Sequence, residues 1–508
     1  MHRVVLHSDT YVDSVVQLSG TRAMRQVDGV DWAAAAMATP VNLEQLAAEG
    51  FDVSGVGAAG VNDLFLAVRA ASQDTVTVAM EAGEAAMFAP RASEGGSAAE
   101  RPVRSLAEAM ERSPGTNVAV ISVPGAYAAL EAHKALSAGL HVLLFSDNVP
   151  IDAEIALKER ANRLGLLVMG PGAGTAMLGH TCLGFANVVR PGRVAVVAAA
   201  GTGAQEVASL LDRWGAGVSQ VIGLGGRDLS SAVAGRMALA AVRGLVLDPE
   251  TDVILLVSKP PAVEVAHAVV RAAAGKPLVA ALIGVPDDFE APEGVVVTRT
   301  LEAGASAAAK AAGIEPPALR AGLADRVRER VTELTPERTL VRGLFSGGTL
   351  CYESLVVLNR VLGPVYSNTP LDDEHGLPAP ARSHCCLDLG EEEFTKGRPH
   401  PMIDPAARIE QLREHGSDPA VAAIILDVVL GHGGHADPAS ELAPVCAELT
   451  GSVVVVYLLG TDSDPQDYAA QRAAFEQAGC LVTDTAAAAS FTAAALATRN
   501  PELAEVLL

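Results

Sequence analysis

Two stretches of the sequence repeat one order of strands, turns and helices, and this repeat constrains the fold more than any other feature. The first stretch runs from residue 193 to about 313, and the second runs from about 339 to 508. Each begins with an apolar strand, a glycine turn and a helix, and each ends in an alanine-rich helix. Strands that alternate with helices predict parallel, doubly wound sheets. We therefore expect two domains of matching topology, paired about a pseudo-two-fold axis.

A glycine turn follows the first strand of each repeat. Glycine permits close approach of the backbone, and the free amide groups of a helix N-terminus favour an anion. Either turn alone is also typical of a tight connection that binds nothing. If the repeats pair, however, both helices point their N-termini at one anion. We predict phosphate or substrate binding by the residues of the two turns, which are Gly201, Thr202, Gly203, Ser346, Gly347, Gly348 and Thr349.

The chain before the repeats predicts two smaller domains. Residues 1–88 have a β-α-β order that indicates a small α+β module of ferredoxin-like type, and residues 89–101 read as a linker. Residues 105–190 alternate helices with apolar strands, which predicts a Rossmann-like domain. Its strands end in polar or glycine-containing loops, where such folds bind ligands, although each loop is also consistent with a simple connection. The repeats then form domains at 191–314 and 338–508, joined by a mostly helical connector.

Composition and charge exclude several classes of protein. The chain has 508 residues, of which 50% are hydrophobic, and this is enough for several domains with sizeable cores. It offers neither the roughly 20 uninterrupted apolar residues of a membrane helix nor a secretory signal, so we expect a soluble, cytoplasmic protein. A formal charge of -23 argues against nucleic-acid binding and requires a local positive site for an anionic substrate. The six cysteines show no CxxC spacing and are expected to be free thiols.

Several segments carry a specific resemblance to a known superfamily. They include ISVPGAYAA (121–129), FSDNVP (145–150), GLGGRDLS (223–230), VSKPPA (257–262) and GRPHPMIDP (397–405). With the paired repeats, these segments resemble the succinyl-CoA synthetase superfamily and, within it, the FdrA family. The resemblance implies a Rossmann-like CoA-binding-type domain followed by two flavodoxin-like ligase-type domains, the first similar to the alpha subunit and the second to the beta subunit. CoA is implied as a possible cofactor by this similarity of fold alone.

The chain departs from the synthetases at two chemically important places. The synthetases carry phosphate on a histidine in a loop after the fourth strand of the alpha ligase domain, where this chain reads IGVPDD (283–288). They also place a glutamate after the third strand, where this chain has Lys259. No ATP-grasp domain is recognisable either. These departures favour a site that holds a free anion and transfers a group from a small acyl phosphate.

The FdrA family is associated with oxamate carbamoyltransferase, which converts oxalurate and phosphate to oxamate and carbamoyl phosphate together with other subunits. The resemblance thus implies a carbamoyltransferase subunit that binds small anions and assembles with other proteins or with copies of itself. A carbamoyl shift needs positioning and charge stabilisation more than a nucleophilic side chain. Two alternatives stay open: a CoA-dependent acyltransferase or acyl-CoA synthetase, and a non-catalytic scaffold of this fold.

Candidate site residues lie in the loops after the strands. Lys259 and Arg227 are predicted charge partners of the substrate, and His400, held between two prolines, is a predicted acid, base or anion donor. The alternative for His400 is a structural hydrogen bond. Further predicted substrate contacts are made by Asn148, Gly225 and Gly226.

Other reactive side chains are weaker candidates. His432 and His435 beside Asp437 have a spacing found among metal ligands, but a glycine-rich turn without a further ligand favours no metal. Cys385 and Cys386 are expected to alternate across a strand. Asp388 and Asp427 lie near the ends of strands that face the presumed site. Alternatively, each is an ordinary polar residue of a loop.

Overall fold

The computed structural model describes residues 1–10, 12, 14–53, 59–60, 62–88, 103–286, 288–396 and 398–507. Its contacts divide the chain into two units, one of residues 1–102 with 395–399, and one of residues 103–394 with 400–508. The predicted linker at 89–101 lies outside the described residues. Within the described ranges, no helix combines the length and the apolar character needed to cross a bilayer.

The N-terminal unit has a three-stranded sheet in the order β1-β3-β2, formed by β1 (His2–His7), β2 (Val30–Met37) and β3 (Leu64–Ala70). The central strand β3 is antiparallel to both neighbours. Helices α1 (Ser14–Arg25) and α3 (Gln73–Phe88) bury one face with Met24, Leu66 and Met80, while α2 (Pro40–Ala48) covers the other. The predicted small α+β module is confirmed, with α3 as an additional helix.

The Rossmann-like region begins with α4 (Leu106–Arg112) and has three parallel strands in the order β4-β5-β6. These are β4 (Val118–Ile121), β5 (His141–Leu144) and β6 (Val168–Met169), connected by α5 (Gly125–Ser137) and α6 (Ile151–Leu164). The hairpin of β7 (Thr175–Leu178) and β8 (Thr181–Gly184) then pairs antiparallel with a strand of the first repeat. The last part of the predicted 105–190 domain therefore extends the neighbouring sheet.

The first repeat contributes five parallel strands to a sheet in the order β13-β12-β11-β9-β10-β7-β8. Its strands are β9 (Pro191–Ala198), β10 (Val218–Gly223), β11 (Val253–Ser258), β12 (Leu278–Leu282) and β13 (Val295–Thr298). Its helices are α7 (Gly201–Arg213), α8 (Arg236–Leu247), α9 (Val263–Arg271) and α10 (Leu301–Ala311), and α11 (Leu323–Val331) lies in the connector.

The second repeat has a parallel sheet in the order β15-β16-β14-β17-β18-β19. Its strands are β14 (Leu340–Phe345), β15 (Val365–Ser367), β16 (His384–Asp388), β17 (Val421–Val429), β18 (Val453–Leu459) and β19 (Leu481–Thr483). Its helices are α12 (Gly348–Leu362), α13 (Glu392–Thr395), α14 (Ala406–Gly416), α15 (Pro438–Glu448), α16 (Tyr468–Gln477) and α17 (Ala486–Thr498), with short 3-10 turns at Asp373–His375 and Pro501–Glu505.

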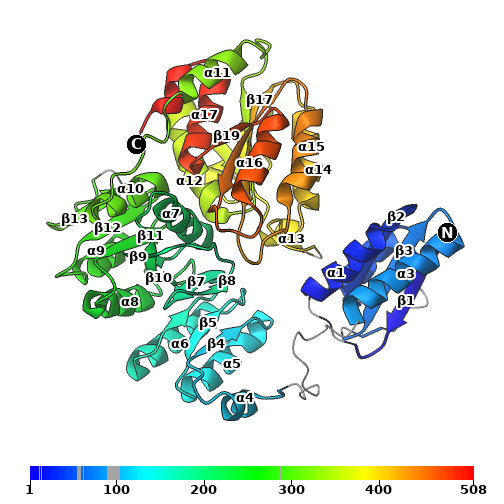
Figure 1. Ribbon diagram of the computed structural model, residues 1–508, viewed down its shortest axis with the longest axis horizontal. Coiled ribbons are helices and arrows are strands. Elements are labelled where there is room, and N and C mark those ends of the chain that lie inside the picture. Colours follow the sequence, from blue (N-terminus) through cyan, green and yellow to red (C-terminus); the bar gives the residue numbers. More distant parts are fainter. Residues whose placement is uncertain are drawn as a thin grey trace. The chain divides into compact units, whose positions relative to one another are not determined.

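Both repeats place their first long strand between the second and the third, which is the flavodoxin-like order. The predicted matching topology is confirmed, and β15 is an extra edge strand in the second repeat. Every residue of β11 and β17 is buried, because helices cover both faces of a parallel sheet. Between the two sheets, α7 and α10 pack against α12 and α17 (Figure 1).

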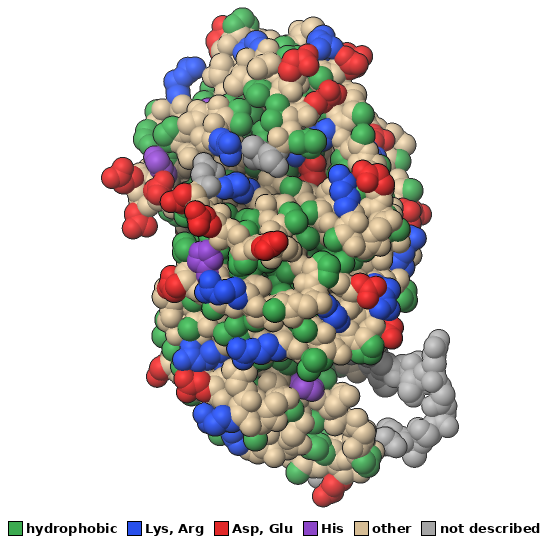
Figure 2. All heavy atoms as spheres, turned by 90° about the vertical axis from the view of Figure 1, so that its left-hand side faces the viewer, with side chains coloured by type: hydrophobic (Ala, Val, Ile, Leu, Met, Phe, Trp, Pro, Cys, Tyr) green, Lys and Arg blue, Asp and Glu red, His purple; other side chains and the backbone are tan. Residues whose placement is uncertain are grey.

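The surface carries charges of both signs. On the face shown in Figure 2, the described Lys and Arg side chains lie among Asp, Glu and apolar ones instead of forming one continuous basic surface. On this face, charge alone does not mark a site for an anionic substrate.

Candidate functional site

The glycine turns of the two repeats meet in the structure. A Cβ atom on Gly203 would lie 2.9 Å from the Thr349 Cγ2 atom, and one on Gly347 would lie 2.8 Å from the Thr202 Oγ1 atom. Real Cβ atoms do not approach other atoms so closely, so a larger residue at either position would have to displace the facing threonine. The first turn of each helix is thereby held against the first turn of the other.

The N-terminus of α7 presents free hydrogen-bond donors. Its N-cap residue, Ala200, has no side chain able to cap the helix, and Gly201 is exposed with open space beside it. Thr202 is only 9% exposed, and its hydroxyl oxygen is buried without a hydrogen-bond partner among the described residues. A buried unpartnered hydroxyl costs roughly 1–3 kcal/mol, so this group lacks a hydrogen-bond partner that the described residues do not supply. The α7 end is therefore the stronger half of the candidate anion site.

The N-terminus of α12 is neutralised from inside the protein. Asp427 accepts hydrogen bonds from the Ser346 amide at 2.8 Å, the Ser346 hydroxyl at 3.1 Å and the Gly347 amide at 2.8 Å. Burial raises the pKa of Asp427, while Arg408, 3.1 Å away, and these donors oppose the change. The predicted donation from Ser346 and Gly347 to a substrate anion is thus at odds with the structure, because both groups already bind this carboxylate. Gly348 and Thr349 remain candidates.

A second carboxylate, Asp388, lies against the start of α12. A Cβ atom on Gly348 would be 2.5 Å from the Asp388 Oδ2 atom. Burial, followed by the charge of Glu391, raises the pKa of Asp388 to about 6, while the Gly390 amide and Lys259 act in the opposite direction. Asp388 can therefore gain or lose a proton near neutral pH, as a general acid or base requires.

His400 faces the same end of α12 as a neutral donor. The Met402 amide donates to His400 Nδ1 at 3.2 Å, which leaves the ring hydrogen on Nε2. Burial and then the charge of Arg408 lower the pKa of His400 to about 4, so the ring stays uncharged at neutral pH. Its Nε2 atom lies beside Gly390, where a Cβ atom would be 2.8 Å away. His400 is thus arranged to donate a hydrogen bond and not to attack as a nucleophile.

Lys259 reaches from the first repeat toward the second. It follows β11, and its Nζ atom lies 5.8 Å from the centre of the Tyr352 ring in α12. No ion pair of Lys259 is formed within the part of the chain that the structure describes. Burial and then Asp372 raise the pKa of Tyr352 to about 12, so its hydroxyl stays protonated beside Gly284. An ammonium group without an ion partner at this place can attract an anion.

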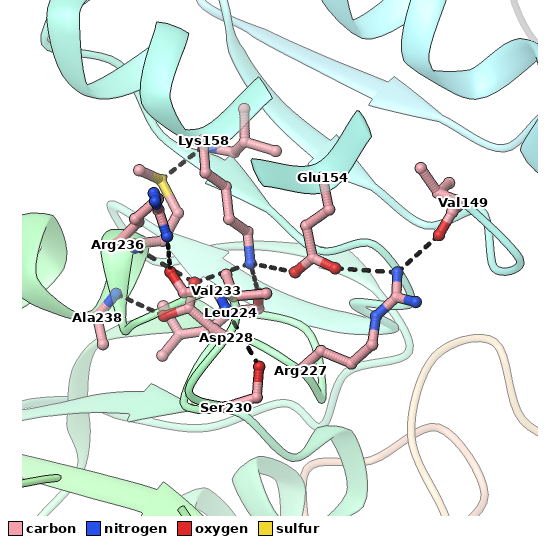
Figure 3. A network of polar contacts seen from close by, with 12 residues as sticks. Val149, Glu154, Lys158, Leu224, Arg227, Asp228, Ser230, Val233, Arg236 and Ala238 are labelled. Atoms are coloured by element: carbon pink, nitrogen blue, oxygen red, sulfur yellow. Dashed lines mark hydrogen bonds and ion pairs between the residues drawn. The ribbon is translucent and has the colours of Figure 1, made fainter. Parts of the chain in front are cut away.

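The structure places the other predicted substrate contacts beside the Rossmann-like region. Arg227 pairs with Glu154 at 2.9 Å and donates to the Val149 carbonyl at 2.7 Å, as Figure 3 shows. Gly225 packs against the Pro171 carbonyl, and Asn148 lies in an exposed left-handed turn. The role of Arg227 as a charge partner of the substrate stays a prediction, while its observed contacts join the two regions of the fold. Gly226 is exposed in the same loop as Gly225.

A buried charge network at this seam was not predicted. Lys158 is 0% exposed, and its Nζ atom lies 2.7 Å from Glu154, 2.8 Å from Asp228 and 2.9 Å from the Leu224 carbonyl (Figure 3). With Arg227, two positive charges balance two negative ones. The spacing of Glu154 and Lys158 on one helix face was a signal in the sequence, but Asp228 is 70 residues from Lys158.

The remaining reactive side chains have structural contacts. His435 Nδ1 accepts from the Asp437 amide at 3.1 Å, and its Nε2 atom lies 3.1 Å from Glu441. Cys385 and Cys386 face different hydrophobic clusters, which confirms that they alternate across β16. All six cysteines are free thiols.

Comparison with known proteins shows similarity to CoA ligases over part of the chain. Residues 344–496 match a family model described as CoA-ligase, and residues 1–102 match one described as AllF, heavy metal-associated domain. Alpha subunit 2 of the ADP-forming succinate–CoA ligase of Archaeoglobus fulgidus is 29% identical over 162 residues, 31% of this chain and 55% of that subunit. The crystal structure of PH0766 from Pyrococcus horikoshii OT3 aligns with 77% of this chain and 86% of its own, with 16% identity and a TM-score of 0.32.

The N-terminal unit does not fit a heavy metal. Residues 1–102 contain no cysteine and two histidines, His2 and His7. His7 lies 3.4 Å from Glu84 and contacts the Phe88 ring. No group of three or more His, Cys, Asp or Glu residues is placed to hold a metal in the described parts of the chain. Soft metals prefer thiolate and imidazole ligands, and this unit does not gather them.

One relative covers nearly the whole molecule. The uncharacterized protein YahF of Escherichia coli K12 is 38% identical over 504 residues, which are 95% of this chain and 96% of YahF. Membership in the FdrA family stays a prediction. The chain belongs to the family of YahF, and it combines a CoA-ligase domain of the succinyl-CoA synthetase-like superfamily with an AllF-type N-terminal domain.

Proposed function

We propose that the chain is a subunit of an enzyme that transfers a small acyl group, specifically the carbamoyl group, at the N-terminus of α7. The observation that carries this proposal is the buried Thr202 hydroxyl, which has no hydrogen-bond partner among the described residues, at a helix end that no carboxylate of those residues caps. Free amides and a hydroxyl at that end suit a phosphate or carbamoyl phosphate. Lys259 follows Val257, which lies beside Gly203, by two residues and would add positive charge.

The side chains at the α12 end suit transfer without a phosphorylated histidine. In carbamoyl transfer from oxalurate to phosphate, the carbon–nitrogen bond breaks, a carbon–oxygen bond to phosphate forms, and oxamate nitrogen takes up a proton. Asp388, with a pKa of about 6, is suited to move that proton, and the His400 Nε2–H group is suited to hold a substrate oxygen. The phosphate itself is the nucleophile, so the chain supplies position and charge.

The identity of the carbamoyl substrate rests on resemblance. The N-terminal match to a model described as AllF and the similarity to the FdrA family favour oxalurate and oxamate over other carbamoyl donors and acceptors. The same resemblance favours action together with other subunits. These assignments stand apart from the site geometry, which selects only a small anion.

A second candidate function is a CoA-dependent acyl transfer or acyl-CoA synthesis. The CoA-ligase model over residues 344–496 and the A. fulgidus succinate–CoA ligase subunit favour it. In that case the Rossmann-like region would hold CoA. The absence of histidine in the loop at 283–286 and the donor role of His400 argue against a phosphohistidine step in the described site.

One experiment separates these functions. The chain is purified with any proteins that copurify, and the complex is supplied with oxalurate and phosphate while carbamoyl phosphate is measured. We expect carbamoyl phosphate to form, and we expect a Thr202→Val variant to lose turnover while a Gly244→Ala variant, in open space on α8, keeps it. CoA binding by calorimetry, together with phosphate labelling of the chain from ATP and no carbamoyl phosphate, would establish the CoA ligase instead.

A further inference from the structure

The two helices that carry the glycine turns each bury a glutamate at the same place. Glu206 lies five residues after Gly201 in α7, and Glu353 lies five residues after Gly348 in α12. Both side chains are 0% exposed. An ionised carboxyl group in such surroundings is unfavourable unless it is paired and hydrogen-bonded, so these two residues require partners.

Each glutamate reaches across to the opposite repeat. Glu206 Oε1 accepts a hydrogen bond from the Ala486 amide at 3.1 Å, and Ala486 is the first residue of α17. Glu353 Oε1 accepts one from the Leu301 amide at 2.6 Å, and Leu301 is the first residue of α10. The same type of hydrogen bond therefore occurs twice across the pseudo-two-fold axis, once from each repeat to the other.

The second oxygen of each carboxyl group has no partner. Glu206 Oε2 and Glu353 Oε2 are both buried without a hydrogen bond in the described parts of the chain. Burial and then the charge of Glu353 raise the pKa of Glu206 well above its usual value. Burial raises the pKa of Glu353 to about 7, Glu302 adds to the effect, and the Leu301 amide and Arg320 oppose it. Two carboxyl groups that interact in this way do not both ionise easily.

The surrounding charged groups do not supply a cation to the pair. Glu302 is paired with Arg320 at 2.8 Å, and Arg213 binds the Tyr468 hydroxyl and the Asp484 carbonyl. Neither arginine forms an ion pair with Glu206 or Glu353 within the described structure. The groups that face the pair from the neighbouring elements are Glu302 of α10, Arg320 of the connector, Arg213 of α7 and Tyr457 of β18.

We propose that Glu206 and Glu353 are positioning residues that form a reciprocal latch, in which each holds its own site helix to the last helix of the opposite repeat through the first amide of that helix. At least one of the two buried carboxyl groups keeps its proton, so that the contact between α7 and α12 does not bury two like charges, and no covalent bond changes. The pair sets how closely α7 and α12 approach at Gly203 and Gly347. Its effect on substrate rests on the proposed function, but the pairing itself does not.

The first test detects the retained proton. The full chain is compared by infrared spectroscopy with Glu206→Gln, Glu353→Gln and the double variant at mildly alkaline pH. Glutamine oxygen still accepts the helix amide, so these variants keep both caps. We expect a buried carboxylic acid band that each single variant shifts or removes and that the double variant lacks. A parent chain without the band, a single variant that leaves it unchanged or a double variant that keeps it would each overturn the proposal. Asp388→Asn, the matched control, should leave the band as it is.

The second test detects the crossed contacts. Hydrogen exchange is followed at the Ala486 and Leu301 amides in Glu206→Ala and Glu353→Ala. We expect each variant to speed exchange at least tenfold at the amide of the opposite repeat, whereas acceleration confined to the mutated repeat would refute the latch. If an alanine variant does not fold, the glutamine series decides. If the infrared band behaves as expected but the chain does not bind phosphate, only the proposed function is refuted. If the chain binds phosphate but lacks the band, only the latch is refuted.

Discussion

The two repeats share a topology but treat the helix N-terminus in opposite ways. In the second repeat, Phe345 is the last residue of β14 and pairs with Asp388 of β16. Leu344 pairs with Leu426 of β17, and Asp427 is the next residue of that strand. Both carboxylates lie at the start of α12. The corresponding pairings in the first repeat lead to Gly223 and Val257, which carry no charge.

Because of this difference, the start of α12 is part of the scaffold, whereas the start of α7 is the candidate binding site. A helix N-terminus carries about half a positive charge, and a carboxylate beside it removes most of the attraction for another anion. Asp427 does this for α12, whereas the start of α7 faces Val257, an apolar residue near Gly203. In two repeats of the same topology, the N-terminus of α12 is therefore neutralised by a carboxylate, and the N-terminus of α7 is available to a ligand.

The largest expected effect is loss of the internal carboxylate. Asp427→Ala should lower the free energy of unfolding by about 3–5 kcal/mol, because it leaves Arg408 buried and unpaired. The matched change in the first repeat, Val257→Ala, should cost only about 1–3 kcal/mol through lost apolar contact. Urea unfolding of both variants measures the difference. An equal or larger loss in Val257→Ala would break the comparison.

The contact between the turns should give the next largest effect. Gly203→Ala places a methyl group on Thr349 and should cost about 1–3 kcal/mol of stability. Gly201→Ala lies in open space of the same helix and should be neutral or stabilising by up to about 1 kcal/mol. Thermal unfolding of the two variants tests this contrast, which fails if both lose stability alike.

The two predicted charge partners should differ in anion binding. Lys259→Met should weaken phosphate binding about tenfold, equivalent to about 1.4 kcal/mol. Arg227→Met should leave phosphate affinity unchanged, because Arg227 is engaged with Glu154 and Val149. Calorimetry on both variants decides the point. Weaker binding in Arg227→Met would return that residue to the site.

The smallest effect is the pH dependence of anion binding. Because the pKa of Asp388 is raised to about 6, its neutral form is favoured by folding, and this contribution to stability is lost as the pH rises through about 6. Sulfate keeps its charge over this range, and its affinity should rise about two- to threefold as the pH falls through 6 and repulsion disappears. Asp388→Asn should bind sulfate with little dependence on pH. A pH dependence that survives in this variant would assign the titration to another group.

Local pattern predicted much of this molecule. The strand-to-helix alternation gave both repeats and their topology, and the glycine turns located the meeting of α7 and α12. Contacts between distant residues were not visible in the sequence, so Ser346 and Gly347 were assigned to a substrate although Asp427, 81 and 80 residues away, binds them. The contact between Arg227 and Glu154 could not be predicted for the same reason, since Glu154 lies in a different region of the fold.

The β7–β8 hairpin has a consequence for any attempt to express the molecule in pieces. It pairs with β10, and the residues just after it contact the second repeat through Ala186 and His432 and through Asn187 and Asp464. A chain cut at residue 190 would leave β10 as a bare apolar sheet edge and would lose the segment that joins both repeats. Such edges seed aggregation. The productive place to divide the polypeptide is consequently before this hairpin, near residue 172, so that it stays with the repeats it completes.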